Sequence, residues 1–397
     1  MKKQPIKISA VVLLALFCAS MLFLVSCQDA PVQDQQRVNG NAMFRGDAAH
    51  AGAETNNDIS FPLRVKWKVY NSRKGIMSTP VVADGLVFFG SFDKNLYALD
   101  ANSGQMRWKF ETGASVVTSP AVSNGVVYFG SADGSFYALD AHTGQKKWIF
   151  QATASPNKLE TAIQSSPVVD DGIVYFGNNE GRMFALDADK GTKIWEFTTK
   201  YKIDESPAVS DGRVYFPSNM VLYSIDAKTG NLIWKSQIQN GLGSTPTVDN
   251  GMVLYDDDVH LLAYNGNTGD VAWKVDSGLG ASVSNPAVKD GVVFYGNQRG
   301  FFAVDALTGA QKWNNTNTSS GTGIPPVFAG GSVYFIDSQA NIDAFDLQTG
   351  ELKGRFKFQA DFSPYWAVPT SMTIANGVIY LGSMDGNVYA IQGATTG

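Results

Sequence analysis

Residues that could carry out acid–base or metal chemistry are few and scattered in this chain of 397 residues. Its three histidines are His50, His142 and His260, and none has another histidine three or four residues away, as a zinc site on one helix would require. No Ser/His/Asp set and no isolated carboxylate pair stands out from the repeated pattern described below. We therefore expect no catalytic residues, no metal and no cofactor, and we interpret the chain as a non-enzyme.

A run of three carboxylates, Asp256-Asp257-Asp258, is the strongest exception. Carboxylate oxygens are the ligands that Ca²⁺ prefers, which makes Asp256 and Asp258 weak candidates for a calcium site. The run lacks the alternate ligand spacing and the distal Glu of an EF-hand loop. We favour a solvated acidic turn as its interpretation.

The cysteines indicate attachment to a membrane. A start with three lysines and a mostly apolar stretch, Ile8–Leu24, precede Ser26 and Cys27, an arrangement that resembles the bacterial lipobox. We expect residues 1–26 to be a lipoprotein signal peptide, removed together with Cys18, and Cys27 to carry the acyl chains. An ordinary signal anchor with an incidental cysteine is the alternative.

Beyond the signal peptide, the sequence predicts a tether and one domain. Residues 27–42 are polar and low in apolar content, which is typical of a flexible tether, and residues 43–397 form the domain. Loss of the three signal lysines takes the formal net charge from −5 to −8, and an acidic chain without a basic run is a poor nucleic-acid binder. With Cys27 as the one remaining cysteine, no intramolecular disulfide can form.

The architecture follows from an eleven-residue pattern, Ala-x-Asp-x-x-Thr-Gly-x-x-x-Trp, that recurs about every 40 residues. Its clearest copy is Ala138, Asp140, Thr143, Gly144 and Trp148. A turn glycine precedes each copy, and the eight glycines are spaced by 39 to 47 residues: Gly85, Gly125, Gly172, Gly212, Gly251, Gly291, Gly331 and Gly377.

Each period holds four short strand candidates separated by turns such as Asn124-Gly125 and Asp133-Gly134. Asn-Gly and Asp-Gly are strong hairpin signals, because both residues tolerate positive φ. Four antiparallel strands per period are the signature of a propeller blade. We predict an all-β fold, an eight-bladed β-propeller of four-stranded antiparallel blades.

The tryptophans fall on the outermost strand of each blade. One aromatic side chain buries roughly 150–250 Å², enough to set the distance between neighbouring blades, so we interpret the tryptophans as packing residues and not as ligand contacts. They are Trp67, Trp108, Trp148, Trp195, Trp234, Trp273 and Trp313.

Ring closure can also be predicted. The last blade stops after its third strand candidate, near Ile391, and the segment Leu63–Val69 carries Trp67, which is 41 residues before Trp108. We expect this N-terminal segment to supply the missing strand, which leaves no long exposed sheet edge.

Two departures from the repeat are candidate partner-binding loops. One insertion contains Ser155, Asn157, Lys158 and Leu159, and the other contains Phe362, Tyr365 and Trp366. Both join a fourth strand to the next first strand, so both emerge on the same face of the ring. Loops that depart from a repeat tend to carry its function, and aromatic residues are typical interface anchors.

Blade seven offers a structural alternative for one of these residues. Gly354 stands where the repeat has tryptophan. Trp366 either anchors a partner or folds inward to fill the gap that Gly354 leaves.

The repeats resemble the pyrroloquinoline-quinone-type propeller family, whose tryptophan-docking motif has the same eleven-residue form. The segment Met43–Gly52 also resembles a lead-in that often precedes these repeats. One group in the family, the quinoprotein dehydrogenases, binds a quinone with Ca²⁺ and often has a vicinal cysteine pair, which this chain lacks. The other group, lipoproteins similar to BamB of the β-barrel assembly machinery, has eight blades, a lipidated cysteine and no catalytic residues.

The resemblance implies a non-catalytic lipoprotein scaffold, anchored through Cys27 at the outer membrane and facing the periplasm. Its partners would be outer-membrane assembly proteins or other envelope proteins, and the propeller would be monomeric within such a complex. The alternative is a protein that binds pyrroloquinoline quinone with Ca²⁺, or a carbohydrate, in the funnel at the ring axis, and that acts in one version as an oxidoreductase.

Overall fold

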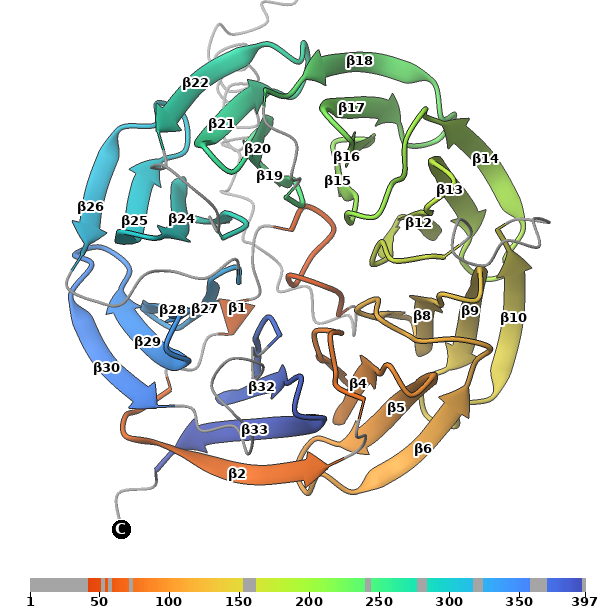
Figure 1. The fold of residues 1–397 in the computed structure, drawn as a ribbon, viewed down its shortest axis with the longest axis horizontal. Coiled ribbons are helices and arrows are strands. Elements are labelled where there is room, and N and C mark those ends of the chain that lie inside the picture. Colours follow the sequence, from red (N-terminus) through yellow and green to blue (C-terminus); the bar gives the residue numbers. More distant parts are fainter. Residues whose placement is uncertain are drawn as a thin grey trace, which may run out of the picture. The chain divides into compact units, whose positions relative to one another are not determined.

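The computed structural model describes residues 42–50, 54–55, 59–70, 74–152, 162–239, 244–276, 284–316, 324–357 and 370–394. These residues form eight antiparallel sheets arranged as blades of a closed ring (Figure 1). The eight-bladed β-propeller predicted from the repeats is confirmed. The described residues also include no helix long and apolar enough to cross a membrane.

The first four blades follow the chain, and each runs from an innermost first strand to an outermost fourth strand (Figure 1). Their strands are β3 (Val81–Ala83), β4 (Leu86–Gly90), β5 (Asn95–Asp100) and β6 (Met106–Glu111) in blade one; β7 (Ala121–Ser123), β8 (Val126–Gly130), β9 (Ser135–Asp140) and β10 (Lys146–Gln151) in blade two; β11 (Val168–Asp170), β12 (Ile173–Gly177), β13 (Arg182–Asp187) and β14 (Lys193–Thr198) in blade three; and β15 (Ala208–Ser210), β16 (Arg213–Ser218), β17 (Val221–Asp226) and β18 (Leu232–Gln237) in blade four.

The remaining blades repeat the same plan, except that the eighth is built from both ends of the domain. Their strands are β19 (Thr247–Asp249), β20 (Met252–Asp256), β21 (His260–Asn265) and β22 (Val271–Asp276) in blade five; β23 (Ala287–Lys289), β24 (Val292–Asn297), β25 (Gly300–Asp305) and β26 (Gln311–Asn315) in blade six; β27 (Val327–Ala329), β28 (Ser332–Ile336), β29 (Asn341–Asp346) and β30 (Leu352–Lys357) in blade seven; and β31 (Thr373–Ala375), β32 (Val378–Gly382), β33 (Asn387–Gly393) and β2 (Leu63–Tyr70) in blade eight.

Burial changes from the inside of each blade to the outside. Every residue of β8 is buried, because blades pack on both faces of this strand. The fourth strand β10 alternates between exposed and half-buried residues. The turn between β7 and β8 has Asn124 at φ 50° and Gly125 at φ 72°, the paired positive values that the Asn-Gly sequence predicts.

The ring closes as predicted. Strand β2 pairs antiparallel with β33, from Leu63 opposite Gly393 to Tyr70 opposite Asn387. Trp67 lies opposite Ala390, as Trp148 lies opposite Ala138 within blade two. The blade assembled from the two ends of the domain therefore keeps the register of the blades formed from continuous chain.

The interface between blades seven and eight uses a different aromatic residue. Gly354 lies opposite Ala344, the register position that tryptophan takes in other blades. A Cβ atom added to Gly354 would lie 2.3 Å from Cγ of Phe61, so the ring of Phe61 covers this glycine. Phe61, two residues before β2, thus occupies the space beside Gly354. The alternative that Trp366 fills this gap stays a prediction, because Trp366 lies outside the described residues.

Residues 42–50 and 54–55, which precede β2, lie inside the ring (Figure 1, red). Ala42 and Val122 exchange two backbone hydrogen bonds, the N–H groups of Val209 and Val248 donate to the carbonyls of Ala48 and Ala49, and β1 (Glu54–Thr55) pairs parallel with β27. The segment thus joins the innermost strands of blades two, four, five and seven.

Candidate functional site

The seven tryptophans lie on the outermost strands and reach across to the next blade. Each indole Nε1 donates a hydrogen bond of 2.8–3.1 Å to a backbone carbonyl in the turn between the next blade's third and fourth strands. The donor and acceptor residues are Trp67 and Ala101, Trp108 and Ala141, Trp148 and Ala188, Trp195 and Ala227, Trp234 and Gly266, Trp273 and Ala306, and Trp313 and Leu347.

The motif glycine lies beneath the indole ring of the preceding blade. A Cβ atom on Gly144 would lie 2.7 Å from Cδ2 of Trp108, and the residue has φ +69°. Both the space and the backbone conformation therefore require glycine. The same contact recurs at Gly104, Gly191, Gly230, Gly269, Gly309 and Gly350.

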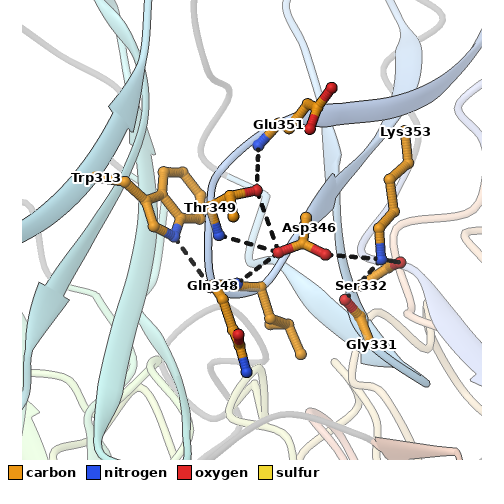
Figure 2. Close-up of polar contacts among 9 residues, drawn as sticks. Trp313, Gly331, Ser332, Asp346, Gln348, Thr349, Glu351 and Lys353 are labelled. Carbon is orange, nitrogen blue, oxygen red and sulfur yellow. Dashed lines mark hydrogen bonds and ion pairs between the residues drawn. The ribbon is translucent and has the colours of Figure 1, made fainter.

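The motif aspartate orders the turn that receives the tryptophan, as Figure 2 shows for blade seven. Oδ1 of Asp346 accepts the N–H groups of Gln348 and Thr349 at 2.9 and 3.0 Å and the Thr349 hydroxyl at 3.2 Å. Lys353 Nζ lies 3.1 Å from its Oδ2. These bonds hold the pKa of Asp346 down at about 2, so the carboxylate stays ionised and keeps accepting hydrogen bonds at any ordinary pH.

Several sequence-predicted residues fall outside the part of the chain that the structure describes. They are Cys27 and the loop residues Ser155, Asn157, Lys158, Leu159, Phe362, Tyr365 and Trp366.

The acidic run of blade five is not the solvated turn that the sequence suggested. Asp256 and Asp257 are 1 and 0% exposed. Asp257 Oδ1 accepts the backbone N–H groups of Val259 and His260 at 3.1 and 2.7 Å, while Asp258 is half-buried. The run is buried because Asp257 supplies the acceptor that folds the turn between β20 and β21. Across the described residues, no three or more His, Cys, Asp or Glu side chains are grouped to hold a metal.

Asp256 stands at a position where five other blades have glycine. In blades one, two, three and eight, a Cβ atom there would lie within 2.2–2.6 Å of an aliphatic side chain from the next connector. In blade five the residue at this position is Asp256, and Oδ2 of its carboxyl group has no hydrogen-bond partner. Burial raises the pKa of Asp256 to about 7.

Two nitrogen-bearing side chains that sequence reasoning missed, those of Arg45 and His50, contact the inner ends of blades five and six. Arg45 donates from Nη1 to the carbonyl of Thr245 at 3.4 Å and from Nη2 to that of Pro286, which joins blades five and six. His50 Nδ1 lies 3.3 Å from the carbonyl of Pro246. In the sequence these two residues were marked only by the resemblance of Met43–Gly52 to a lead-in segment. That resemblance did not predict where in the fold the segment lies.

Burial keeps His50 neutral and weakens the basicity of Arg45. The pKa of His50 is lowered to about 3 by burial and by the nearby Arg45 charge. Burial also lowers the pKa of Arg45 to about 9, which leaves the guanidinium protonated at neutral pH. The remaining atoms Arg45 Nε and His50 Nε2 have no hydrogen-bond partner.

A belt of hydrogen bonds links the inner ends of successive blades. The backbone N–H of Thr79 donates to Ser119 Oγ at 2.9 Å, that of Ser119 to Ser166 Oγ at 3.0 Å, and that of Ser166 to Ser206 Oγ at 3.1 Å. At the next interface the corresponding hydroxyl belongs to Thr245, and it donates to Glu205 Oε2 at 3.2 Å.

Glu205 replaces a hydroxyl residue that has a defined role in other blades. There a Ser or Thr oxygen accepts the N–H of the residue that ends the buried part of the second strand, as Thr118 does from Gly130 and Ser165 from Gly177. In blade four that residue is Pro217, which has no N–H to donate. The hydroxyl acceptor is not needed there, and a carboxylate stands in its place.

The Glu205 carboxyl is poised to gain or lose a proton near neutral pH. Its side chain is half-buried, and burial, helped by the charge of Asp204, raises its pKa to about 7. The Tyr255 hydroxyl lies in its field: burial and the Glu205 charge raise the pKa of this phenol. The inner ends of blades four and five can therefore hold a proton or attract a cation.

The comparisons with known proteins agree with this fold. The family model described as "Outer membrane protein assembly factor BamB" matches residues 64–201 and 181–396. No curated protein sequence matches the chain.

Solved structures with the same fold belong to both enzymes and non-enzymes. BamB from Moraxella catarrhalis is 18% identical, covers 85% of this chain and 99% of its own, and has a TM-score of 0.66. The quinohemoprotein alcohol dehydrogenase from Comamonas testosteroni is 15% identical, covers 84% and 77%, and has a TM-score of 0.67. A europium-containing methanol dehydrogenase is 13% identical, covers 88% and 97%, and has a TM-score of 0.69. At these identities the likeness shows the fold alone.

Proposed function

Because the chain belongs to the family described as outer membrane protein assembly factor BamB, we propose that it is a non-catalytic scaffold of the cell envelope. Cys27 carries its lipid anchor and holds it at the outer membrane, facing the periplasm. Its partners are proteins that assemble outer-membrane β-barrels, and they bind the face that carries the connectors from fourth to first strands.

The observation that carries this proposal is the way the ring axis is filled. Met43, Arg45 and His50 are 6, 6 and 0% exposed, and the segment that bears them bonds to the inner strands of several blades. A ring with its own chain along the axis supports a role for its faces and outer edge, where a protein partner can dock. Buried cross-blade bonds also make it a rigid platform, which a scaffold requires.

Affinity purification tests the proposal. Full-length lipidated protein with a C-terminal tag is expected to recover outer-membrane assembly proteins, and Cys27→Ala to recover less because it leaves the membrane. A Tyr365→Ala, Trp366→Ala double variant should lower recovery at least tenfold, the effect of losing about 1.4 kcal/mol or more of binding free energy. The matched control is Leu307→Ala, which removes a side chain that is 65% exposed in a turn on the opposite face of the ring.

Recovery of no assembly protein by the wild type, together with an unchanged outer-membrane barrel profile after deletion, would refute the scaffold role. Equal loss of recovery in the Leu307→Ala control would refute the choice of face.

A quinone-dependent oxidoreductase is the second candidate, favoured by the fold shared with the two dehydrogenases. Titration of the purified protein with pyrroloquinoline quinone and Ca²⁺ tests it. A spectral change and a rise in Tm support this candidate, whereas the scaffold proposal expects neither.

A further inference from the structure

Three departures from the repeat meet where blades four and five approach each other. Glu205 replaces Ser or Thr, Pro217 replaces the glycine of five other blades, and Tyr255 replaces the phenylalanine found at the same strand position in blades one, two, three, four and seven, a replacement that blade six shares with Tyr295. The proline removes the need for a hydroxyl, and the carboxylate and phenol that follow bring polar oxygen atoms into a region that is apolar elsewhere.

No Lys, Arg or His side chain among the described residues forms an ion pair with the Glu205 carboxylate, although the charge of Lys202 acts on it. The nearby ammonium of Lys202 lies 2.5 Å from Asp204 Oδ2, and the guanidinium of Arg45 donates to backbone carbonyls. The hydrogen bond that Glu205 accepts within the described chain comes from the neutral Thr245 hydroxyl. A half-buried carboxylate in this state is more stable when a cation binds beside it.

Tyr255 is an independent sign of a ligand. The side chain is 0% exposed, and its hydroxyl makes no hydrogen bond of ordinary geometry, although the Ser244 backbone acts on it. A buried hydroxyl without a partner costs about 1–3 kcal/mol relative to a satisfied one. The phenylalanine of five other blades would avoid this cost, so the hydroxyl is retained at a loss to folding.

We propose that Glu205, Thr245 and Tyr255 form a binding site for a primary ammonium group. An ammonium ion has three N–H donors and no acceptor, and the site offers carboxylate, hydroxyl and phenol oxygens as acceptors. The ammonium compensates the charge of Glu205 and gives the Tyr255 oxygen a donor. The site goes beyond the proposed scaffold role and does not depend on it.

Calorimetric titration of the full propeller with Nα-acetyl-lysine methylamide tests the site. Binding is expected at pH 8, where Glu205 is ionised, and at least fivefold weaker at pH 6, where it holds its proton. The Nε-acetylated probe has no ammonium group and is expected not to bind. Spermidine is the second probe: tighter binding of spermidine assigns the site to free polyamines, and tighter binding of the lysine probe assigns it to a lysine side chain.

Variants locate the site. Glu205→Gln should weaken binding at least tenfold and Tyr255→Phe three- to tenfold, while Glu111→Gln, an exposed carboxylate on β6, should stay within twofold of the wild type. The double variant Glu205→Ser, Pro217→Gly restores the pair used in other blades, so it should fold and still fail to bind. The proposal would be overturned if the wild type bound neither amine. It would also be overturned if Glu205→Gln bound the amines as tightly as the wild type, or if the acetylated probe bound as tightly as the lysine probe.

Discussion

The outer edge of the ring and the inner ends of blades four and five follow opposite rules. At the outer edge, seven tryptophans make one contact seven times, with the same donor, the same type of acceptor and a glycine beneath the ring. At the inner ends, Glu205, Tyr255 and Asp256 each occur at a position where most blades have another residue type. All three carry a buried or half-buried polar group, and in Tyr255 and Asp256 one oxygen of that group has no hydrogen-bond partner. The repeated contact builds the ring, and the unrepeated one is where a ligand can be recognised.

The largest effect is expected from breaking the outer contact. Trp195→Ala removes an indole that is 7% exposed and its hydrogen bond to Ala227, so the free energy of unfolding should fall by about 3–5 kcal/mol. Urea denaturation measures this loss. Ile233→Ala, which trims a side chain 41% exposed on β18, is the control and should cost less than about 1 kcal/mol. A loss that small for Trp195→Ala would show that interblade docking is dispensable.

The interface between blades seven and eight should respond as a coupled pair. Gly354→Ala places a Cβ atom 2.3 Å from the Phe61 ring, and such overpacking should cost about 1–3 kcal/mol. In a Phe61→Ala background the same change should cost almost nothing, because the obstructing ring is gone. A double-mutant cycle by urea denaturation measures the coupling, and additive losses would contradict the contact.

The inner carboxyls should make stability fall as pH rises. Glu205 and Asp256 have pKa values raised to about 7 in the folded chain, whereas in the unfolded chain they ionise near their ordinary values of about 4. Between these values the folded state holds protons that the unfolded state has lost, so stability is greatest below about pH 4 for these groups and declines through pH 7.

Glu205→Gln and Asp256→Asn should each flatten this decline, by about 1–3 kcal/mol between pH 5 and 8 in denaturation curves. Asp346→Asn is the contrasting variant. Its pKa is lowered to about 2, so it should leave the slope in this range unchanged. Wild-type stability that is flat from pH 5 to 8 would show that neither inner carboxyl is desolvated.

The smallest effects compare two phenols that differ in their partners. Tyr128 donates to the carbonyl of Ala188 at 3.1 Å, so Tyr128→Phe should cost about 0.5–1.5 kcal/mol. Tyr255 has no partner for its hydroxyl, so Tyr255→Phe should be neutral or raise stability by up to about 1 kcal/mol. Thermal unfolding should show a lower Tm for Tyr128→Phe and an unchanged or higher Tm for Tyr255→Phe. A clear loss in both would show that Tyr255 has a folding partner.

The sequence predicted the features that short local patterns encode and that every repeat contains. The Asn-Gly turns, the spacing of the tryptophans and the orphan Trp67 predicted the blade count, the strand order and the closure by β2. The same reasoning misjudged residues whose environment is set from a distance. Asp256 and Asp257 look like a polar turn in the sequence, yet packing of neighbouring blades buries them. Phe61 lies outside any repeat, so nothing in its own neighbourhood pointed to Gly354.

The sequence alone determined the ring, because about 40 residues encode the strands and turns of each blade. The same pattern of strands and turns recurs in eight repeats. The tertiary structure alone decided what lies inside the ring and at its irregular interfaces. Arg45 meets its acceptor Pro286 across 241 residues of chain and His50 meets Pro246 across 196. No local pattern encodes such contacts, because they arise only when closure brings the lead-in segment against the inner strands and desolvates the groups it meets.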